Sequence, residues 1–384
     1  MSITSPNLSG FYAYTETLKG VHYGPGSVKT ALPKLLASVG GNRAFIITGK
    51  TLYTATNVVK TVENVLKEHN AYSATFYEIG QHAPIAGVRN GVKAFKDAGA
   101  DVIVSVGGGS PVDAAKAILY FIQQETGGRC LPQIAIPTTL SAAEYSIGAG
   151  FTNEQGEKSR ITSTELAPAG IILDAELTLA TPERLWLSTG LRALDHAVEN
   201  LYRPGPGVPI PLKYLCCVAI ADLFTYLPKS KANAQDVEVR QRLQVASWMS
   251  VWPIKDERRG PLGLSHALGH KLGATYGIPH GITSCLTLAP VVNLKAEVAS
   301  QADKEALAAV LFYLRQESTG SVNGDVRKLS SLIQQLVVDL GLKSTLSEYN
   351  VPNDDLPKIA QLAVGGDNND PLVNNVISLL QGIF

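Results

Sequence analysis

Three of the chain's seven histidines lie close together in the stretch GLSHALGHKLGATYGIPHG, at 263–281. Imidazoles can bind a metal ion or move protons near neutral pH. His266 and His270 are four residues apart in a predicted helix, so both project from one face, and His280 follows a Gly-Ile-Pro break. His196 lies in a second predicted helix, LRALDHAVE. The pattern leaves open whether these four imidazoles bind a metal, move protons or pack in the core.

Arg192 precedes His196 by one helical turn and therefore shares its face. A guanidinium has no lone pair, stays protonated, and repels a divalent cation. Two interpretations follow. Either Asp195 neutralises Arg192 while three of the imidazoles bind zinc or iron, or no metal binds and Arg192 holds a substrate carboxylate or carbonyl oxygen. A third possibility is an Arg192–Asp195 salt bridge with no role in substrate binding.

A glycine-rich turn occurs in DVIVSVGGGSPVDAAKAILYF, where an apolar strand runs into a helical pattern. Three glycines at 107–109 let the backbone approach a ligand closely. We expect Ser110 to cap the helix, Pro111 to be its first residue and Asp113 its third. Free N–H groups at such a helix start attract a phosphate. The turn therefore predicts a nucleotide site.

The surrounding pattern alternates short apolar runs with helical periods, which favours a parallel sheet covered by helices. The predicted strands lie at 43–49, 72–80, 101–109 and 131–139. Beyond residue 175 the strand pattern fades and helical periods follow one another. We predict a Rossmann-like α/β dinucleotide-binding domain at 1–175 and an all-helical catalytic domain at 176–384.

Composition excludes several classes of protein. Among 384 residues, 33 basic side chains balance 33 acidic ones, so no positive field favours nucleic acid. Four cysteines at spacings unsuited to a disulfide framework or a zinc site favour a reducing compartment. The chain also lacks a pattern for a signal peptide or a membrane span. We expect a cytoplasmic protein that acts on a small molecule, with no membrane or nucleic-acid partner.

Several motifs in this order resemble the iron-containing (group III) alcohol dehydrogenase family: GGGSPVDAAKAI, IPTTLSAAE, IILDAELTLATPERL, STGLRALDHAVE and the three-histidine stretch. The resemblance spans nearly the whole chain. It implies a dehydroquinate synthase-like architecture of two domains with the active site between them, a nicotinamide cofactor, and a homodimer. The residues that it places at the cofactor are Gly107, Gly108, Gly109, Ser110, Asp113, Thr138, Thr139 and Ser141.

Within that family, VHYGPG, QHAP, HAVENLY and HALGHKLGATYGIPH resemble the maleylacetate reductase branch. Metal-dependent members carry an aspartate at the position of Arg192, and the metal ligands would correspond to His196, His266 and His280. Maleylacetate reductases lack that acidic ligand and are regarded as not needing metal. The branch resemblance therefore favours the interpretation without metal. GGGSPVDAAK itself is closer to the alcohol dehydrogenases.

The strand RAFIITGK bears on the choice between NAD and NADP. NAD-preferring alcohol dehydrogenases of the family have an acidic residue at its end, where this chain has Gly49. Without a carboxylate, repulsion of a 2′-phosphate disappears, and Lys50 adds attraction. We expect NADP(H) to be accepted at least as well as NAD(H).

The resemblance implies an oxidoreductase that transfers hydride to an activated carbonyl or a conjugated enone, with a carboxylate-bearing substrate of the maleylacetate type favoured. We expect His270 to lie nearest the nicotinamide and to transfer the proton, while His196, His266 and His280 polarise the substrate. One alternative is a metal-dependent alcohol dehydrogenase or aldehyde reductase using three histidines. An alternative of another class is a nucleotide-binding protein without catalytic activity.

Overall fold

The computed structural model describes residues 10–12, 17–80, 83–154, 158–203, 210–252, 260–366 and 370–384. One sheet comprises β1 (Gly10–Tyr12), β2 (Gly20–Tyr23), β3 (Ala44–Ile47), β4 (Tyr72–Phe76), β5 (Val102–Gly107), β6 (Gln133–Pro137) and β9 (Gly170–Leu173). Its order is β1-β2-β9-β6-β5-β3-β4, and only the β1–β2 pair is antiparallel. An antiparallel hairpin of β7 (Gly148–Thr152) and β8 (Lys158–Thr162) stands apart from it.

The strand order reverses between β3 and β5. From β3 the chain proceeds to β4 at one edge, and then returns to β5, which lies on the other side of β3 and leads on to β6. In open α/β sheets, ligands bind beyond the carboxyl ends of strands at such a switch point. The segments that follow β3 and β5 are therefore the expected binding elements of this sheet.

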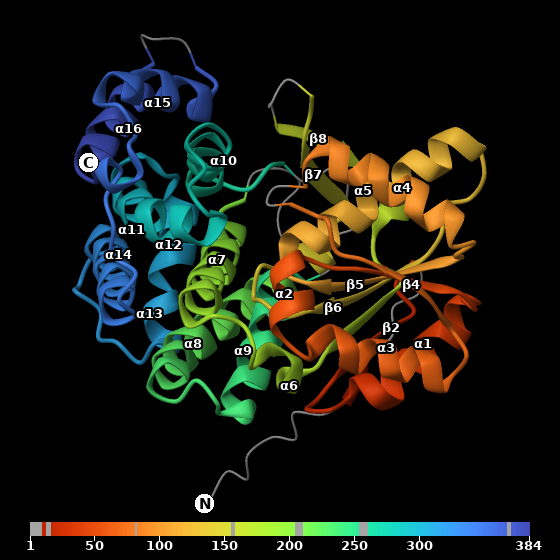
Figure 1. Ribbon diagram of the computed structural model, residues 1–384. Coiled ribbons are helices and arrows are strands. Elements are labelled where there is room, and N and C mark those ends of the chain that lie inside the picture. The colour runs from red at the N-terminus through yellow and green to blue at the C-terminus, as the bar shows by residue number, and fades with distance from the viewer. Residues whose placement is uncertain are drawn as a thin grey trace, which may run out of the picture. The chain divides into compact units, whose positions relative to one another are not determined.

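Helices cover both faces of the sheet, as Figure 1 shows. One face packs against α1 (Val28–Val39) and α3 (Val58–Glu68), and the other against α4 (Ile85–Asp97) and α5 (Gly109–Thr126). Strand β5 is buried along its whole length, as expected for a central strand with helices on both sides. The shorter helices of this part are α2 (Lys50–Ala55) and α6 (Ala175–Thr178), with 3₁₀ turns η1 (Ala143–Tyr145) and η2 (Thr164–Leu166).

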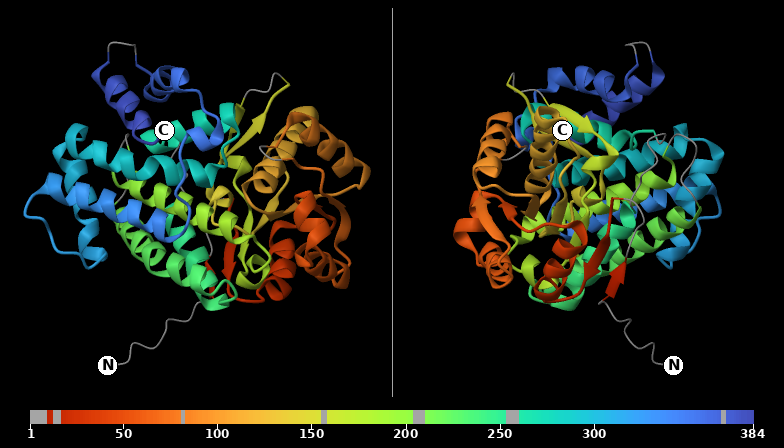
Figure 2. Two further views of the ribbon diagram at one scale, coloured as in Figure 1. Left: turned by 60° about the vertical axis from the view of Figure 1, so that its left-hand side comes forward. Right: turned by 90° about the vertical axis from the view of Figure 1, so that its right-hand side faces the viewer.

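The described chain after β9 contains helices and no strand, visible as the green-to-blue part of Figure 2. These helices are α7 (Glu183–Leu201), α8 (Ile210–Ala232), α9 (Val237–Ser250), α10 (Leu264–Tyr276), α11 (His280–Val298), α12 (Gln301–Ala308), α13 (Val310–Tyr313), α14 (Val322–Asp339), α15 (Leu356–Val364) and α16 (Pro371–Gln381). Two 3₁₀ turns, η3 (Ser347–Tyr349) and η4 (Asn353–Asp355), precede α15.

The chain divides into two compact units. The first takes in the described residues up to Thr181 together with Gln235–Val245, and the second takes in Pro182–Ala234, Ala246–Trp252 and the described residues from 260 onward. This division differs from the predicted single boundary between residues 175 and 176, because most of α9 packs with the α/β unit. In that contact the Gln241 side chain forms hydrogen bonds with the backbones of Leu173 and Ala175. The predicted fold class, a Rossmann-like α/β part and a helical part, is confirmed.

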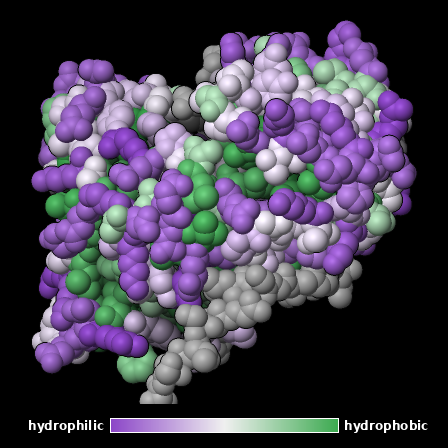
Figure 3. Space-filling model, turned by 60° about the horizontal axis from the view of Figure 1, so that its bottom comes forward, coloured by the Kyte–Doolittle hydropathy of each residue, from purple (hydrophilic) through white to green (hydrophobic). Residues whose placement is uncertain are grey.

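The surface mixes polar and apolar side chains. On the face drawn in Figure 3, hydrophobic areas lie between hydrophilic ones. Among the large hydrophobic residues that the structure describes, Phe312 is the most exposed, with a relative exposure of 81%. None of the described helices is long and apolar enough to cross a membrane.

Candidate active site

The glycine-rich turn links β5 to α5, at the switch point of the sheet. Gly107 has φ of +139°, a conformation that side chains with a Cβ rarely adopt. Helix α5 begins at Gly109 with Gly108 as its N-cap. The prediction that Ser110 caps the helix was therefore wrong by two residues, and Pro111 is the third helical residue. A proline is tolerated there because the first N–H groups of a helix have no partner within it.

Asp113 consequently lies beyond the first turn of α5. Its Oδ2 accepts a hydrogen bond from the Gly150 N–H at 3.5 Å, and its Oδ1 lies 3.8 Å from Lys116 Nζ. We expected Asp113 at the third helical position. This expectation was wrong because α5 begins at Gly109, two residues earlier than predicted. The carboxylate is directed toward β7 and Lys116.

The segment after β6 packs against the glycine turn. The Thr138 N–H donates to the Gly107 carbonyl at 2.9 Å, and Thr139 Oγ1 and Ser141 Oγ lie 3.2 Å apart. A Cβ on Gly108 would lie 3.1 Å from Thr139 Cγ2, which is closer than side chains normally allow. The structure thus brings together the glycine turn, Thr139 and Ser141, as the sequence predicted for a nucleotide site.

Gly49 follows β3 on the other side of the switch point and is the N-cap of α2. Its φ of −91° and ψ of 149° are open to any residue, and a Cβ there would meet nothing within 4 Å. Lys50 begins the helix and is exposed. A Cβ on Gly107 would lie 3.7 Å from Leu52, so α2 adjoins the glycine turn.

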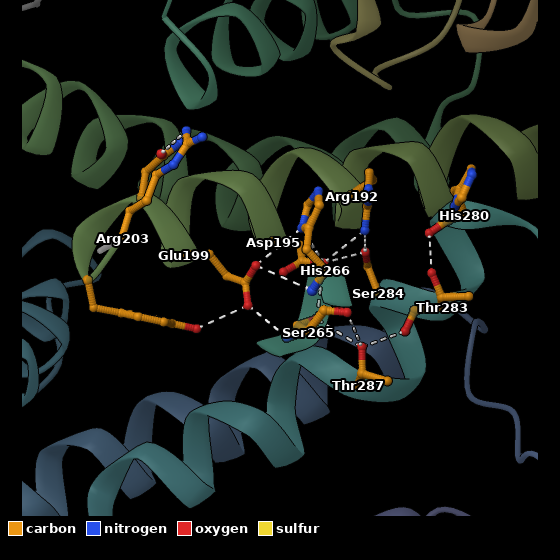
Figure 4. A network of polar contacts seen from close by, with 12 residues as sticks. Arg192, Asp195, Glu199, Arg203, Ser265, His266, His280, Thr283, Ser284 and Thr287 are labelled. Carbon is orange, nitrogen blue, oxygen red and sulfur yellow. Dashed lines mark hydrogen bonds and ion pairs between the residues drawn. The ribbon is translucent and has the colours of Figure 1, made fainter. Parts of the chain in front are cut away.

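Arg192, Asp195 and Glu199 project from one face of α7 toward Ser265, His266 and Ser284, as Figure 4 shows. Arg192 Nη1 donates to Asp195 Oδ2 at 3.3 Å and to Ser284 Oγ at 3.1 Å. Asp195 Oδ2 also accepts from Ser284 Oγ at 2.6 Å and Ser265 Oγ at 3.1 Å. Although burial opposes its ionisation, the nearby His266, Arg192 and Ser284 hold the pKa of Asp195 below its ordinary value.

Glu199 joins α7 to the start of α10. Its Oε1 accepts from the Ser265 N–H at 2.8 Å and its Oε2 from the His266 N–H at 3.3 Å, which satisfies two free donors of the helix terminus. A Cβ at Gly263, the N-cap, would lie 2.6 Å from Glu199 Oε1. Glycine at 263 therefore permits the carboxylate to reach the helix, and the contact fixes the position of His266.

The four histidines lie near one another in the helical unit. The ring centroids of His196 and His266 are 4.8 Å apart. The ring centroid of His270 is 6.0 Å from that of His266 and 6.0 Å from that of His280. Burial, reinforced by the charges of His266 and Arg192, lowers the pKa of His196 well below its ordinary value, so this imidazole is neutral. His196 and His266 are buried, whereas His270 is exposed.

His266 has carboxylates beside its Nδ1. Glu199 Oε2 lies 3.2 Å from this nitrogen and Asp195 Oδ2 lies 3.6 Å from it. Neither oxygen forms a hydrogen bond with the nitrogen, because the angles are unsuitable. Potential ligand atoms of these three residues lie within 4.8 Å of one another. Hydrogen bonds already engage three of the four carboxylate oxygens, and Arg192 supplies a positive charge beside Asp195.

Sequence reasoning missed Glu199, Ser265 and Ser284, which complete this network. Glu199 could have been found, because it follows Arg192 by seven residues on the same helical face. Ser265 and Ser284 carry no comparable signal. The Arg192–Asp195 ion pair, which the sequence left as one of several possibilities, is present. His82, which carried part of the branch resemblance, lies outside the described residues.

A parallel sheet with a glycine turn at its switch point, followed by a helical unit bearing four clustered imidazoles, is the arrangement expected of a nucleotide-binding enzyme. The model of the iron-containing alcohol dehydrogenase family matches residues 19–175, and that of the family's C-terminal part matches residues 186–381. The chain belongs to the iron-containing alcohol dehydrogenase family. The prediction of the family from its motifs is confirmed.

The relatives include alcohol dehydrogenases and maleylacetate reductases. The chain is 27% identical over 358 residues to an NAD-dependent methanol dehydrogenase of Bacillus methanolicus, covering 88% of this chain and 90% of the relative. It is 29% identical over 294 residues to a maleylacetate reductase of Rhizobium sp. strain MTP-10005, covering 76% and 75%. The crystal structure of maleylacetate reductase from that strain matches with a TM-score of 0.77 and 25% identity over 98% of both chains.

These findings confirm the dehydroquinate synthase-like architecture and an enzyme that uses a nicotinamide cofactor to oxidise or reduce a small molecule. They also confirm the resemblance to the maleylacetate reductase branch.

Proposed function

We propose that the enzyme reduces a carboxylate-bearing substrate at an activated carbonyl or a conjugated enone, without a divalent metal ion. The observation that carries this proposal is the guanidinium of Arg192 beside Asp195, whose carboxylate also lies next to the buried His266. In metal-dependent relatives, by the resemblance, an acidic ligand would stand at this position. A fixed positive charge there replaces a ligand with a group that repels the ion.

The hydrogen bonding of Arg192 supports a role in binding an oxygen of the substrate. Among the residues that the structure describes, only two accept hydrogen bonds from Arg192, and both bonds come from Nη1. The acceptors are Asp195 of α7 and Ser284 of α11. Nε and Nη2 remain as donors for a ligand. A planar guanidinium binds a carboxylate through two parallel hydrogen bonds, which suits a substrate of the maleylacetate type.

The donor set does not suit a divalent metal. His196, His266 and His280 supply three imidazoles, but the fourth position of the family's set is cationic, and three of the four carboxylate oxygens of Asp195 and Glu199 are engaged in the network. The rival function, a zinc- or iron-dependent alcohol dehydrogenase, requires these three histidines to hold the ion beside Arg192. The charge of Arg192 would repel a divalent ion held there. The same charge would attract a substrate carboxylate.

The nicotinamide, when bound, supplies the hydride. Arg192 orients the substrate by holding its carboxylate through charge-assisted hydrogen bonds. The neutral His196, with His266 and His280, polarises the substrate, and the exposed His270 moves the proton. The alternative is a nucleotide-binding protein without catalytic activity. The presence of all four histidines in one cluster argues against it.

A substrate panel tests this function. We expect NADPH oxidation to be at least about tenfold faster, as kcat/KM, with unsaturated or 2-oxo dicarboxylates than with neutral aldehydes of similar size. A preference for neutral aldehydes would favour the alcohol dehydrogenase instead. No turnover on either class, with intact cofactor binding, would favour the nucleotide-binding protein.

We also propose that NADP(H) is used at least as well as NAD(H), because Gly49 leaves no carboxylate at the end of β3. The change Gly49→Asp fits without strain, since the backbone is ordinary and the space is open. We expect it to weaken NADPH binding about tenfold or more and NADH binding far less, because the new charge repels the 2′-phosphate. Fluorescence titration with each cofactor measures this.

Gly49→Asn is the matched control, because it adds the same bulk without charge. It should leave the ratio of NADPH to NADH affinity within about threefold of the wild-type value. An equal loss in both variants, or a large preference of the wild type for NADH, would show that Gly49 does not set cofactor choice.

By the resemblance we further propose a homodimer in the cytoplasm, and light scattering of the purified protein tests the oligomeric state.

A further inference from the structure

Lys116 of α5 is completely buried, with a relative exposure of 0%. Its ammonium nitrogen lies within hydrogen-bond distance of four oxygens of one short segment, which share its three N–H groups: Ala143 O at 2.7 Å, Ser146 O at 2.8 Å, Ser146 Oγ at 2.9 Å and Gly148 O at 3.1 Å. A buried cation is unfavourable unless hydrogen bonds and opposite charges compensate it. Here the compensation comes mostly from backbone carbonyls, so the lysine fixes the course of the main chain.

The segment held by Lys116 begins beside the glycine turn. A Cβ on Gly109 would lie 3.5 Å from Ser141 Oγ and 3.7 Å from Ala143 Cβ. Between these two residues, Ala142 has φ of +60°, a left-handed conformation that is uncommon for alanine. Surrounding contacts must therefore hold Ala142 in place, and the bond from Lys116 to Ala143 is the adjacent one.

Charged groups around Lys116 offset part of the effect of its burial. Burial lowers the pKa of Lys116, while Asp113 and Glu144 act in the opposite direction and Arg160 adds to the lowering. Burial also raises the pKa of Glu144 to about 7. Asp113 Oδ1 lies 3.8 Å from the ammonium nitrogen, and the charges of Asp113 and Glu144 offset part of the lowering that burial causes.

We propose that Lys116 is a positioning residue that holds residues 139–148 against the glycine turn and so shapes the wall of the nucleotide site. This inference rests on the proposed placement of the cofactor at Gly107–Gly109, Thr139 and Ser141. Lys116 itself is buried behind this wall and contacts neither cofactor nor substrate. Its effect is to keep Ala142 in its left-handed conformation and Ser141 beside Gly109.

Lys116→Met tests the proposal, because methionine keeps much of the length and removes the ammonium. We expect amide hydrogen exchange in residues 139–148 to rise about tenfold or more, since buried carbonyls lose their donor. The Kd for NADPH should rise about tenfold or more, while kcat at saturating NADPH stays within about threefold. Lys60→Met on the exposed surface of α3 is the matched control and should change none of these quantities by more than about twofold.

Two outcomes would overturn the proposal, and they differ in meaning. Unchanged exchange in 139–148 would show that Lys116 does not hold the segment. Faster exchange with unchanged NADPH affinity would show that the segment is not a wall of the nucleotide site, which contradicts the proposed cofactor placement. If wild-type protein binds neither NADPH nor NADH, the proposed function fails, while the exchange measurement still tests the role of Lys116.

If Lys116→Met does not fold, Ser146→Ala provides the test, because it removes one acceptor and leaves the ammonium in place. The same changes should follow at smaller size, about threefold in exchange and in NADPH affinity. Ala142→Gly should restore part of either loss, since glycine adopts φ of +60° without cost. Failure of Ser146→Ala to alter either quantity would contradict the proposal.

Discussion

His270→Ala is expected to lower kcat at least about 100-fold while the Kd for NADPH changes less than about twofold. His270 is exposed on α10, and its ring is 6.0 Å from those of His266 and His280, whereas His196 and His266 are buried. An exposed imidazole can reach a bound substrate and exchange its proton with water. General acid–base catalysis by one positioned group contributes a factor of this size.

His69→Ala, a substitution of a histidine at the end of α3, is the matched control and should leave kcat within about twofold. Single-turnover measurements with premixed enzyme and NADPH separate the chemical step from product release. A turnover number of His270→Ala near the wild-type value would remove His270 from the proton transfer. Loss of NADPH affinity in proportion to kcat would instead indicate a role in cofactor binding.

Arg192→Ala is expected to lower kcat/KM for dicarboxylate substrates about 10- to 100-fold, and for neutral aldehydes less than about threefold. The reason is that the guanidinium binds the carboxylate through charge-assisted hydrogen bonds that a neutral substrate does not form. The substitution also leaves Asp195 buried without its cation, which strongly destabilises the folded state. Thermal unfolding must therefore be measured alongside activity.

A second variant separates the two effects. Arg192→Met with Asp195→Asn removes both charges, so it should regain stability but not selectivity for carboxylates. Arg184→Ala, on the same helix but at the surface, is the matched control and should alter neither. Equal losses on carboxylates and neutral aldehydes would show that Arg192 serves only the structure of the site.

The sequence predicted the α/β part well because its signals are local. The apolar run DVIVSVG has the length and composition of a central strand, and the structure places β5 within it. The cap of α5 could not be predicted to the residue. Three successive glycines give the chain several ways to enter the helix, and tertiary contacts such as that of Gly108 with Thr139 select one.

The candidate site was predictable only in part, because its residues meet through packing between helices distant in sequence. Periodicity placed Arg192, Asp195 and His196 on neighbouring positions of α7, and the ion pair followed from their spacing. The bond from Arg192 to Ser284 joins residues that are 92 positions apart, and that from Glu199 to Ser265 joins residues 66 apart. No local pattern specifies which serines face these side chains.

The metal content of the active enzyme tests the central claim most directly. Protein purified without chelator is analysed by inductively coupled plasma mass spectrometry, and NADPH-dependent reduction is assayed before and after EDTA. Because Arg192 disfavours a cation at the histidine cluster, we predict zinc and iron far below one equivalent per chain and activity unchanged by EDTA. Near-stoichiometric zinc or iron with activity lost to EDTA would contradict the account and show that three histidines suffice for metal-dependent reduction.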